Sequence, residues 1–124
     1  MPEGHSIHRL AIRHRSRLVG HAVRASSPQG RFAAGAALID GQVLEGTDAW
    51  GKHLFHRYGD RWLHVHLGLF GSFRDGRGPA ADPRGALRLR LRLTTDDRWA
   101  DLRGPTACEL LTGAERADLL GRLG

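Results

Sequence analysis

A strict alternation of leucine and arginine at residues 86–93, ALRLRLRL, constrains the fold more than any other stretch of this sequence. Successive side chains of a β-strand point to opposite faces, so the pattern buries a leucine at every second position from Leu87 to Leu93. The arginines then face water or an anion. Residues 98–102 can pair with this strand across a turn at residues 95–97. We therefore predict an antiparallel sheet with one face in the core.

Other short stretches also have the composition of strands. Residues 43–47 alternate between apolar and polar side chains, and residues 54–58 and 62–67 flank a turn signal, Gly59-Asp60-Arg61. A short mixed strand is predicted at residues 21–27. Residues 75–85 are rich in glycine, proline and charge, so we predict a loop there.

Helices are predicted at both ends of the chain. Apolar residues recur at Ile7, Leu10, Ala11 and Leu18, with His14 on the same face, which is helical spacing. This pattern predicts a helix over residues 4–19. A second, short helix is predicted over residues 112–123, with Thr112 as its N-cap.

The sum is one mainly β domain of 124 residues, a β-sandwich or flattened barrel with an N-terminal helix and a short C-terminal helix. No stretch approaches the roughly 18 apolar residues of a membrane span, and the first residues lack the apolar run of a signal peptide. We therefore expect a cytoplasmic monomer that does not enter a membrane. The single cysteine, Cys108, excludes an internal disulfide and a cysteine-rich zinc site within these residues.

The chain is strongly basic, with a net charge of +6 and an isoelectric point near 11.1. This charge favours a polyanionic partner, nucleic acid before membrane, although an arginine-rich composition also arises from a GC-rich genome. Lys52 is the only lysine among 19 basic residues. Because lysine can exchange its proton and arginine keeps it, this position is a candidate for chemistry.

Proline at position two is informative because the initiator methionine is normally removed before a small residue. Pro2 then carries a free secondary amine, and an α-amino group titrates near about 7.7–8.0. The positive end of the predicted helix lowers that pKa further. Such an amine can attack a sugar carbon and form an iminium, while Glu3 beside it can move protons.

Four separated motifs together resemble the formamidopyrimidine-DNA glycosylase and endonuclease VIII family. They are MPEGH at the terminus, AWGKHLF at residues 49–55, HLGLFGSF at residues 66–73 and DLRGPTACELLT at residues 101–112. Their order, spacing and local structure agree with the family over essentially the whole chain. The Pro-Glu-Gly-His start is closer to the actinobacterial endonuclease VIII-like branch.

The resemblance implies a role for each matching residue. Pro2 matches the nucleophile that attacks C1′ of the damaged nucleotide, and Glu3 matches its acid/base partner. Lys52 matches the lysine that pairs with DNA phosphate and assists proton transfer.

The resemblance also implies a DNA-binding segment at Gly68, Leu69 and Phe70. The last two match side chains that fill the gap left by a flipped nucleotide, although the same stretch could instead be a buried strand. Gly68 and Ser6 depart from the family, which often carries glutamine and glutamate there. Because of these departures, the resemblance implies neither which base the protein prefers opposite the lesion nor how the pocket is built at position 6.

By resemblance, the chain is the N-terminal catalytic domain, residues 1–124, of a bifunctional glycosylase and AP lyase of base-excision repair. We expect this activity of the full-length protein, and weak or no activity of residues 1–124 alone. Its partner would be damaged duplex DNA carrying oxidised bases, pyrimidines in particular, cleaved through a Schiff base and β/δ-elimination. The family's helix–two-turn–helix and zinc-finger half is absent, so we expect no cofactor here and zinc only in that other half. The alternatives are a non-catalytic DNA-binding module and an N-terminal-proline tautomerase, which would begin with an apolar strand.

The remaining histidines and the cysteine carry weaker signals. The histidines that could form a metal cluster have no acidic or cysteine partner at ligand spacing, so no metal site is predicted. They are His5, His8, His53, His56, His64 and His66. Cys108 is interpreted as a small buried hydrophobic residue.

Overall fold

The computed structural model describes residues 4–123, and within them two antiparallel sheets of four strands face each other. The first sheet has the order β1 (Val23–Ser26), β6 (Leu87–Leu93), β7 (Arg98–Arg103), β5 (Ser72–Arg77). The second has the order β2 (Gly46–Trp50), β3 (His53–Tyr58), β4 (Arg61–His66), β8 (Ala107–Thr112). The sheets do not close into a barrel, so the predicted sandwich is confirmed.

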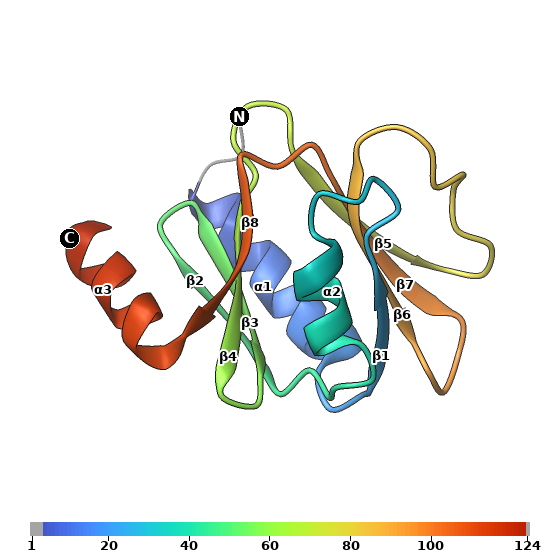
Figure 1. Cartoon of the computed structure of the whole chain (residues 1–124), viewed down its shortest axis with the longest axis horizontal. Helices are drawn as coiled ribbons and strands as arrows, with labels where there is room; N and C mark the ends of the chain where they lie inside the picture. The colour runs from blue at the N-terminus through green and yellow to red at the C-terminus, as the bar shows by residue number, and fades with distance from the viewer. Residues whose placement is uncertain (1–3, 124) are drawn as a thin grey trace.

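Three helices complete the described part of the chain: α1 (Gly4–Leu18), α2 (Ala33–Ile39) and α3 (Gly113–Leu123). Helices α1 and α2 lie between the two sheets, on opposite sides, and α3 lies outside the second sheet (Figure 1). No helix among residues 4–123 is both long and apolar enough to cross a membrane.

The leucine–arginine alternation behaves as predicted. Leu87, Leu89, Leu91 and Leu93 are all at most 5% exposed, and β6 pairs antiparallel with β7. On the opposite face Arg90 is buried rather than solvated, because its guanidinium donates to both carboxylate oxygens of Asp101 at 2.8 and 2.9 Å. Of the arginines on this face, Arg90 therefore meets an anion that the sheet itself supplies.

Helix α1 joins both sheets, and its predicted buried face, including His14, is confirmed. Toward the second sheet, the hydroxyl of Thr47 donates to the carbonyl of Ala11 at 2.7 Å. Toward the first sheet, Arg13 and Arg17 both pair with the Asp75 carboxylate, at 2.8 and 2.5 Å. The helix thus fixes the spacing of the two sheets along one open side of the sandwich.

The predicted cap of α3 is also confirmed. The backbone amide of Glu115 donates to the Thr112 hydroxyl at 3.1 Å, and the Thr112 amide donates to the Glu115 carboxylate at 2.9 Å. This reciprocal pair is a capping box, which satisfies two amides at the start of the helix.

Two predicted boundaries are wrong. The strand predicted at residues 43–47 runs from Gly46 to Trp50, because Val43 makes only an isolated bridge to Ala22 and is 43% exposed. The loop predicted at residues 75–85 begins three residues later, since β5 continues to Arg77 in register with β7. Gly76 suits that strand because a Cβ there would lie 2.7 Å from the Trp99 ring.

Candidate functional site

The strand register of the second sheet brings two distant turns to one end of the molecule. His53 is opposite both Trp50 and His66, and His66 is opposite Ala107. The β2–β3 turn, which holds Lys52, therefore lies beside the segment 67–71 that follows β4. The described beginning of α1 lies at this end as well (Figure 1).

Lys52 borders a shallow, open cavity of about 420 Å³. Gly51 has φ +58°, a left-handed conformation that lets the chain reverse before Lys52. The cavity is lined by Trp50, Gly51, Lys52, His53, His66 and Leu123. One ammonium and two imidazoles thus face the same space, which suits an anionic ligand or proton transfer.

Three histidines and one carboxylate form a continuous array from this cavity across the sheet. His53 Nδ1 lies 2.8 Å from His64 Nε2, and His64 Nδ1 lies 2.7 Å from the Glu109 carboxylate. The His66 ring stacks on His53 with 4.6 Å between centroids. The array begins at the cavity and ends at Glu109, whose side chain is half exposed.

The surroundings keep two of these imidazoles neutral. Desolvation lowers the pKa of His53, and repulsion by His64 and His66 lowers it further. Desolvation also lowers the pKa of His66, with contributions from His64 and Lys52. Both rings therefore keep an unprotonated nitrogen, which is a proton acceptor, at neutral pH.

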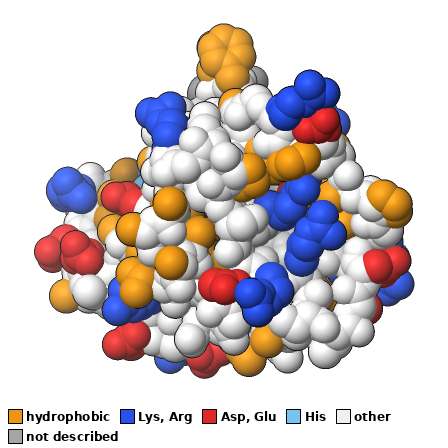
Figure 2. Space-filling model, turned by 45° about the vertical axis from the view of Figure 1, so that its right-hand side comes forward, with side chains coloured by type: hydrophobic (Ala, Val, Ile, Leu, Met, Phe, Trp, Pro, Cys, Tyr) orange, Lys and Arg blue, Asp and Glu red, His pale blue; other side chains and the backbone are white. Residues whose placement is uncertain are grey.

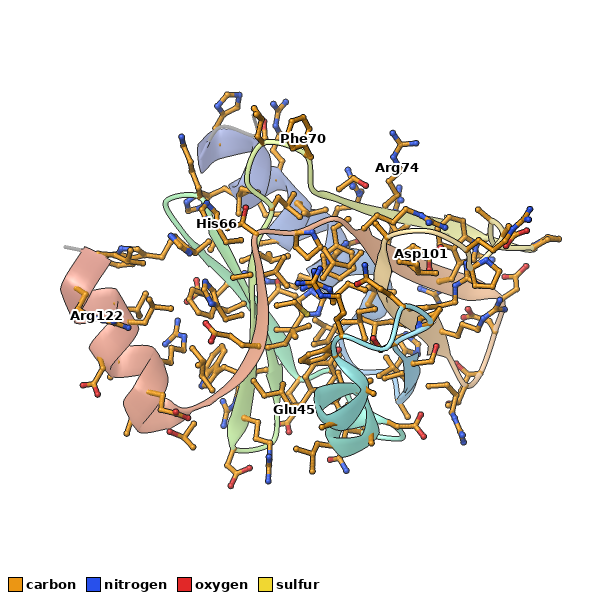
Figure 3. The ribbon with its side chains drawn as sticks, turned by 45° about the horizontal axis from the view of Figure 1, so that its top comes forward. Glu45, His66, Phe70, Arg74, Asp101 and Arg122 are labelled. Atoms are coloured by element: carbon orange, nitrogen blue, oxygen red, sulfur yellow. The ribbon has the colours of Figure 1, made fainter. Side chains whose placement is uncertain are left out.

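The segment 67–71 presents its apolar side chains to solvent. Leu69 is 63% and Phe70 is 86% exposed, so the alternative of a buried strand is wrong. Figure 3 shows Phe70 at the end of the molecule, on the turn between β4 and β5. An exposed apolar pair on a turn is costly in water unless a partner covers it.

This turn is held in shape by its own glycines. Gly68 has φ +68°, and a Cβ there would lie 1.9 Å from the hydroxyl oxygen of Thr106 on the β7–β8 connection. A Cβ at Gly71 would lie 2.2 Å from the Leu67 carbonyl, to which the Gly71 amide donates at 3.0 Å. The tip is therefore preformed and packed against a neighbouring loop.

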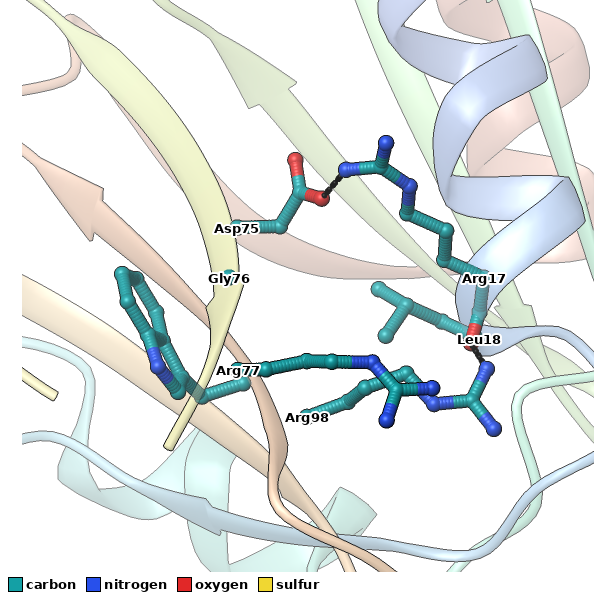
Figure 4. A pocket seen from close by; sticks show the side chains of 7 residues that line it. Arg17, Leu18, Asp75, Gly76, Arg77 and Arg98 are labelled. Atoms are coloured by element: carbon teal, nitrogen blue, oxygen red, sulfur yellow. Dashed lines mark hydrogen bonds and ion pairs between the residues drawn. The ribbon is translucent and has the colours of Figure 1, made fainter. Parts of the chain in front are cut away.

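A second cavity, of about 410 Å³, lies at the opposite end of α1 (Figure 4). Its arginines already have partners: Arg17 binds Asp75, and Arg98 binds both the Arg17 carbonyl and Asp96. None of the predicted site residues borders it. Its lining is Arg17, Leu18, Asp75, Gly76, Arg77, Arg98 and Trp99.

Basic side chains gather on one face of the molecule. Figure 2 shows arginine side chains over the face that the first sheet presents, with only scattered carboxylates between them. Arg74 of β5 and Arg103 of β7 border one hollow on this sheet. Such a face suits a polyanion that extends beyond a single site.

The structure thus brings together Lys52, Gly68, Leu69 and Phe70, whereas Pro2 and Glu3 lie outside the described residues. The link between His64 and Glu109 was not predicted from the sequence. No acidic partner was expected for the histidines because β8, the strand that places Glu109 opposite His64, was not predicted. Within residues 4–123 no group of three or more His, Cys, Asp or Glu side chains is arranged to hold a metal ion.

Cys108 is partly buried against the core, in agreement with its interpretation as a small hydrophobic residue. Burial raises the pKa of its thiol to about 12. The thiolate is therefore scarce at neutral pH, which argues against a nucleophilic role.

Comparison with known proteins gives a consistent result. The family model for the formamidopyrimidine-DNA glycosylase N-terminal domain matches residues 1–108. The proteins named Endonuclease 8 1 of Mycobacterium tuberculosis and Mycobacterium bovis are 49% identical over the whole chain, which covers 47% of their length. The chain therefore spans about half the length of these curated relatives.

A solved structure of MutM in complex with DNA containing carbocyclic 8-oxo-G superposes with a TM-score of 0.81 at 18% identity. The alignment covers 98% of this chain and 49% of that one. At this identity the likeness shows a shared fold.

Proposed function

Because the chain belongs to the formamidopyrimidine-DNA glycosylase family, through the family's N-terminal domain, we propose that it is the catalytic domain of a DNA-repair glycosylase and AP lyase. The observation that carries the proposal is the family match over residues 1–108, together with the 49% identity to Endonuclease 8 1. The remaining DNA-gripping half of the enzyme, with any zinc finger, would lie outside residues 1–124. The chain itself would need no cofactor.

The proposed reaction starts at the amine of Pro2, once Met1 is removed. The nitrogen lone pair attacks C1′, the glycosidic bond breaks, and the base leaves with a proton that Glu3 supplies. Opening of the sugar ring gives an iminium between Pro2 and C1′. Elimination of the 3′-phosphate and then the 5′-phosphate cleaves the strand.

Lys52 has two roles in this scheme. Its ammonium binds a phosphate of the damaged strand, and its exchangeable proton assists transfer at the sugar. The shallow cavity that it shares with His53 and His66 supports the first role, because it is open enough for a phosphodiester and holds no carboxylate among its lining residues.

On this proposal, Leu69 and Phe70 at the tip of the turn bind the DNA and take no part in bond cleavage. A stacked base must leave the helix before its C1′ can be attacked, and the gap must then be filled. The exposure of both side chains suits that role, and so does the packing of the turn against Thr106, because a wedge held in one conformation loses little conformational entropy on insertion.

The substrate class follows from the closer relatives. They carry the name Endonuclease 8, and the Pro-Glu-Gly-His start of this chain resembles the same branch, so we propose oxidised bases, pyrimidines in particular, as the lesions. On this proposal the protein acts as a monomer on damaged duplex DNA in the bacterial cytoplasm.

Reductive trapping tests the proposal. Borohydride should convert the iminium between the chain and an abasic-site oligonucleotide into a stable adduct, and Pro2→Gly should lose most of it. Mass spectrometry should place the crosslink on Pro2. A crosslink on Lys52, or an undiminished yield in Pro2→Gly, would overturn the assignment, and DNA binding without any adduct would indicate a non-catalytic module.

A further inference from the structure

The Glu109 carboxylate sets where the hydrogens of His64 and His53 lie. A carboxylate only accepts, so at 2.7 Å His64 must carry its hydrogen on Nδ1. In the form of the array in which His64 carries a single hydrogen, its other nitrogen, Nε2, is an acceptor, and at 2.8 Å it takes the hydrogen of His53 Nδ1. By the same rule, Nε2 of neutral His53 has no hydrogen.

The bare nitrogen belongs to a ring that lines the Lys52 cavity. His53 follows Lys52 directly in the chain. Its ring lies edge to edge with that of His64, with 5.0 Å between centroids, and stacks on His66, with 4.6 Å between centroids. This stacking holds the imidazole plane in place, while the bond to His64 sets which edge faces the cavity. The result is a base of fixed tautomer and orientation beside the only lysine.

We propose that His53 is a catalytic base for strand cleavage, oriented by His64 and Glu109 as positioning residues. The inference rests on the proposed function. In the step, His53 Nε2 takes the proton from C2′ of the sugar held as the Pro2 iminium. The electrons of that C–H bond form the C2′=C3′ double bond, the C3′–O bond breaks, and the 3′-phosphate leaves with its electron pair.

The same array returns the proton to water. His53 passes its Nδ1 hydrogen to His64 Nε2, and His64 passes its own Nδ1 hydrogen to Glu109, which solvent reaches. The lowered pKa of His53, caused first by desolvation, leaves the ring unprotonated and ready at neutral pH. The charged and titratable groups around the array are Lys52 on the β2–β3 turn, His64 and His66 on β4, Glu109 on β8, and Glu115, Arg116, Asp118 and Arg122 on α3.

Two readouts on a single-stranded abasic oligonucleotide separate this inference from the proposed function. Adduct trapping reports the iminium, and single-turnover strand cleavage reports the elimination. In His53→Asn the side-chain amide can still donate to His64 but supplies no base. Trapping should stay within about two-fold of the unaltered chain, while cleavage should fall by roughly 10²-fold, the usual contribution of a general base.

Glu109→Gln should slow cleavage about ten-fold and move the acid limb of its pH profile to lower pH, because the carboxylate no longer stabilises a proton on the array. Asp118→Asn is the matched control: it removes one exposed charge beside the same hollow of α3 and β8 but touches no histidine, so its rate and profile should be unchanged. If the pH profile of strand cleavage is the same for Glu109→Gln and the unaltered chain, the array has only a structural role.

Long-range ¹H–¹⁵N spectra of the histidines test the geometry without any substrate. His53 and His64 should both be Nδ1–H tautomers, and Glu109→Gln should change the population of this state. An Nε2–H tautomer at His53, or cleavage by His53→Asn at the unaltered rate, would overturn the proposal. Absence of any trapped adduct in the unaltered chain would overturn the proposed function, and the catalytic role of His53 with it.

Discussion

Lys52 is the only lysine among the 19 basic residues of the chain, and it stands where a compact, exchangeable charge has most effect. The left-handed Gly51 turns the chain at this point, and His53 and His66 border the same cavity. Every other basic position of this protein is an arginine, so the fold itself tolerates guanidinium groups widely. The role that we propose for this lysine, proton exchange in addition to charge, can therefore be tested by replacing it with arginine.

We expect Lys52→Arg to fail to restore the activity lost in Lys52→Ala. A guanidinium keeps its proton and spreads its charge over a planar fork, so it can bind a phosphate but cannot exchange a proton. Strand cleavage of an abasic oligonucleotide, measured at saturating protein, should fall at least ten-fold in both variants, while Lys52→Arg should retain DNA affinity. If Lys52→Arg cleaves the strand at the unaltered rate, Lys52 contributes only a phosphate contact and no proton exchange.

At the level of single elements, the DNA insertion that we propose for the turn after β4 can be tested separately from its effect on stability. Phe70 is 86% exposed, so Phe70→Ala should leave the melting temperature within about 1 °C, since little apolar area is lost from the core. Excision of an oxidised base from duplex DNA by the full-length enzyme should nevertheless fall at least ten-fold. Cleavage of a single-stranded abasic site, where no stack has to be opened, should not change, and an equal loss on both substrates would contradict the wedge role.

Helix α3 depends on one arginine. None of its described residues is buried, but the Arg116 guanidinium lies 4.0 Å from the Trp62 ring centre and 4.9 Å from that of Phe55, and it pairs with Asp48. Arg116→Ala should weaken the docking of α3 by about 1–2 kcal/mol. Amide hydrogen exchange should speed up in α3 and not in β3 or β4.

Arg116→Lys provides the matched control for this contact. A lysine keeps the charge but loses the flat stacking surface, so it should recover only part of the protection. Exchange in α3 at the original rate in Arg116→Ala would show that the capping box and the contacts with β8 suffice to hold the helix.

Elements with strong periodicity were predictable from the sequence, and elements defined by their partners were not. The leucines of β6 and the apolar face of α1 were predicted because each apolar residue of the repeating pattern is a side chain that points into the core. Helix α2 was missed because its seven residues, AAGAALI, bury only Ala36 and Ile39 and are too short to show a period. Strand β8 was missed because Cys108, Glu109 and Leu110 do not alternate, and its pairing with β4 is what orders it.

Some residues of the candidate site were likewise predictable from the sequence, and others were not. Lys52, Leu69 and Phe70 were predicted because they belong to motifs that resemble a known family. The His53–His64–Glu109 array was not, since it joins β3, β4 and β8 across positions that only the sheet register brings together.

Across the whole molecule, a buried histidine pair links helix α1 to both sheets. His14 and His56 are at most 1% exposed, with His14 Nδ1 and His56 Nε2 2.9 Å apart, and the His14 ring contacts Phe73 of β5 edge-on. Burial lowers the pKa of His14 to about 3, with repulsion from Arg13 and Arg17 adding to it, and burial lowers that of His56 as well. Both rings are therefore neutral in the folded protein.

This pair should make the fold sensitive to acid. Below a pH of about 6.5 the unfolded chain binds protons on these histidines and the folded chain does not, so the free energy of unfolding falls by up to about 1.4 kcal/mol per pH unit for each ring. Urea unfolding at pH 7, 6 and 5 should show this slope. The loss should continue until the pH reaches the folded-state value near 3 for His14.

A His14→Leu and His56→Leu double variant should lose most of this slope between pH 7 and 5, whatever its absolute stability. His21→Gln, which removes a half-exposed histidine, should keep the slope. A slope in the double variant equal to that of the unaltered chain would assign the acid sensitivity to the carboxylates instead.

The contact between Gly68 and Thr106 links two positions that are 38 residues apart in sequence. A side chain at position 68 and the hydroxyl at position 106 would need the same space, so position 68 cannot gain a side chain while Thr106 keeps its place. In related proteins we expect a larger residue at the first position only where the second is smaller or its loop runs elsewhere. Accordingly, Gly68→Gln should be tolerated better together with Thr106→Gly than by itself, so any change in how this turn addresses the opposite strand would require two substitutions in concert.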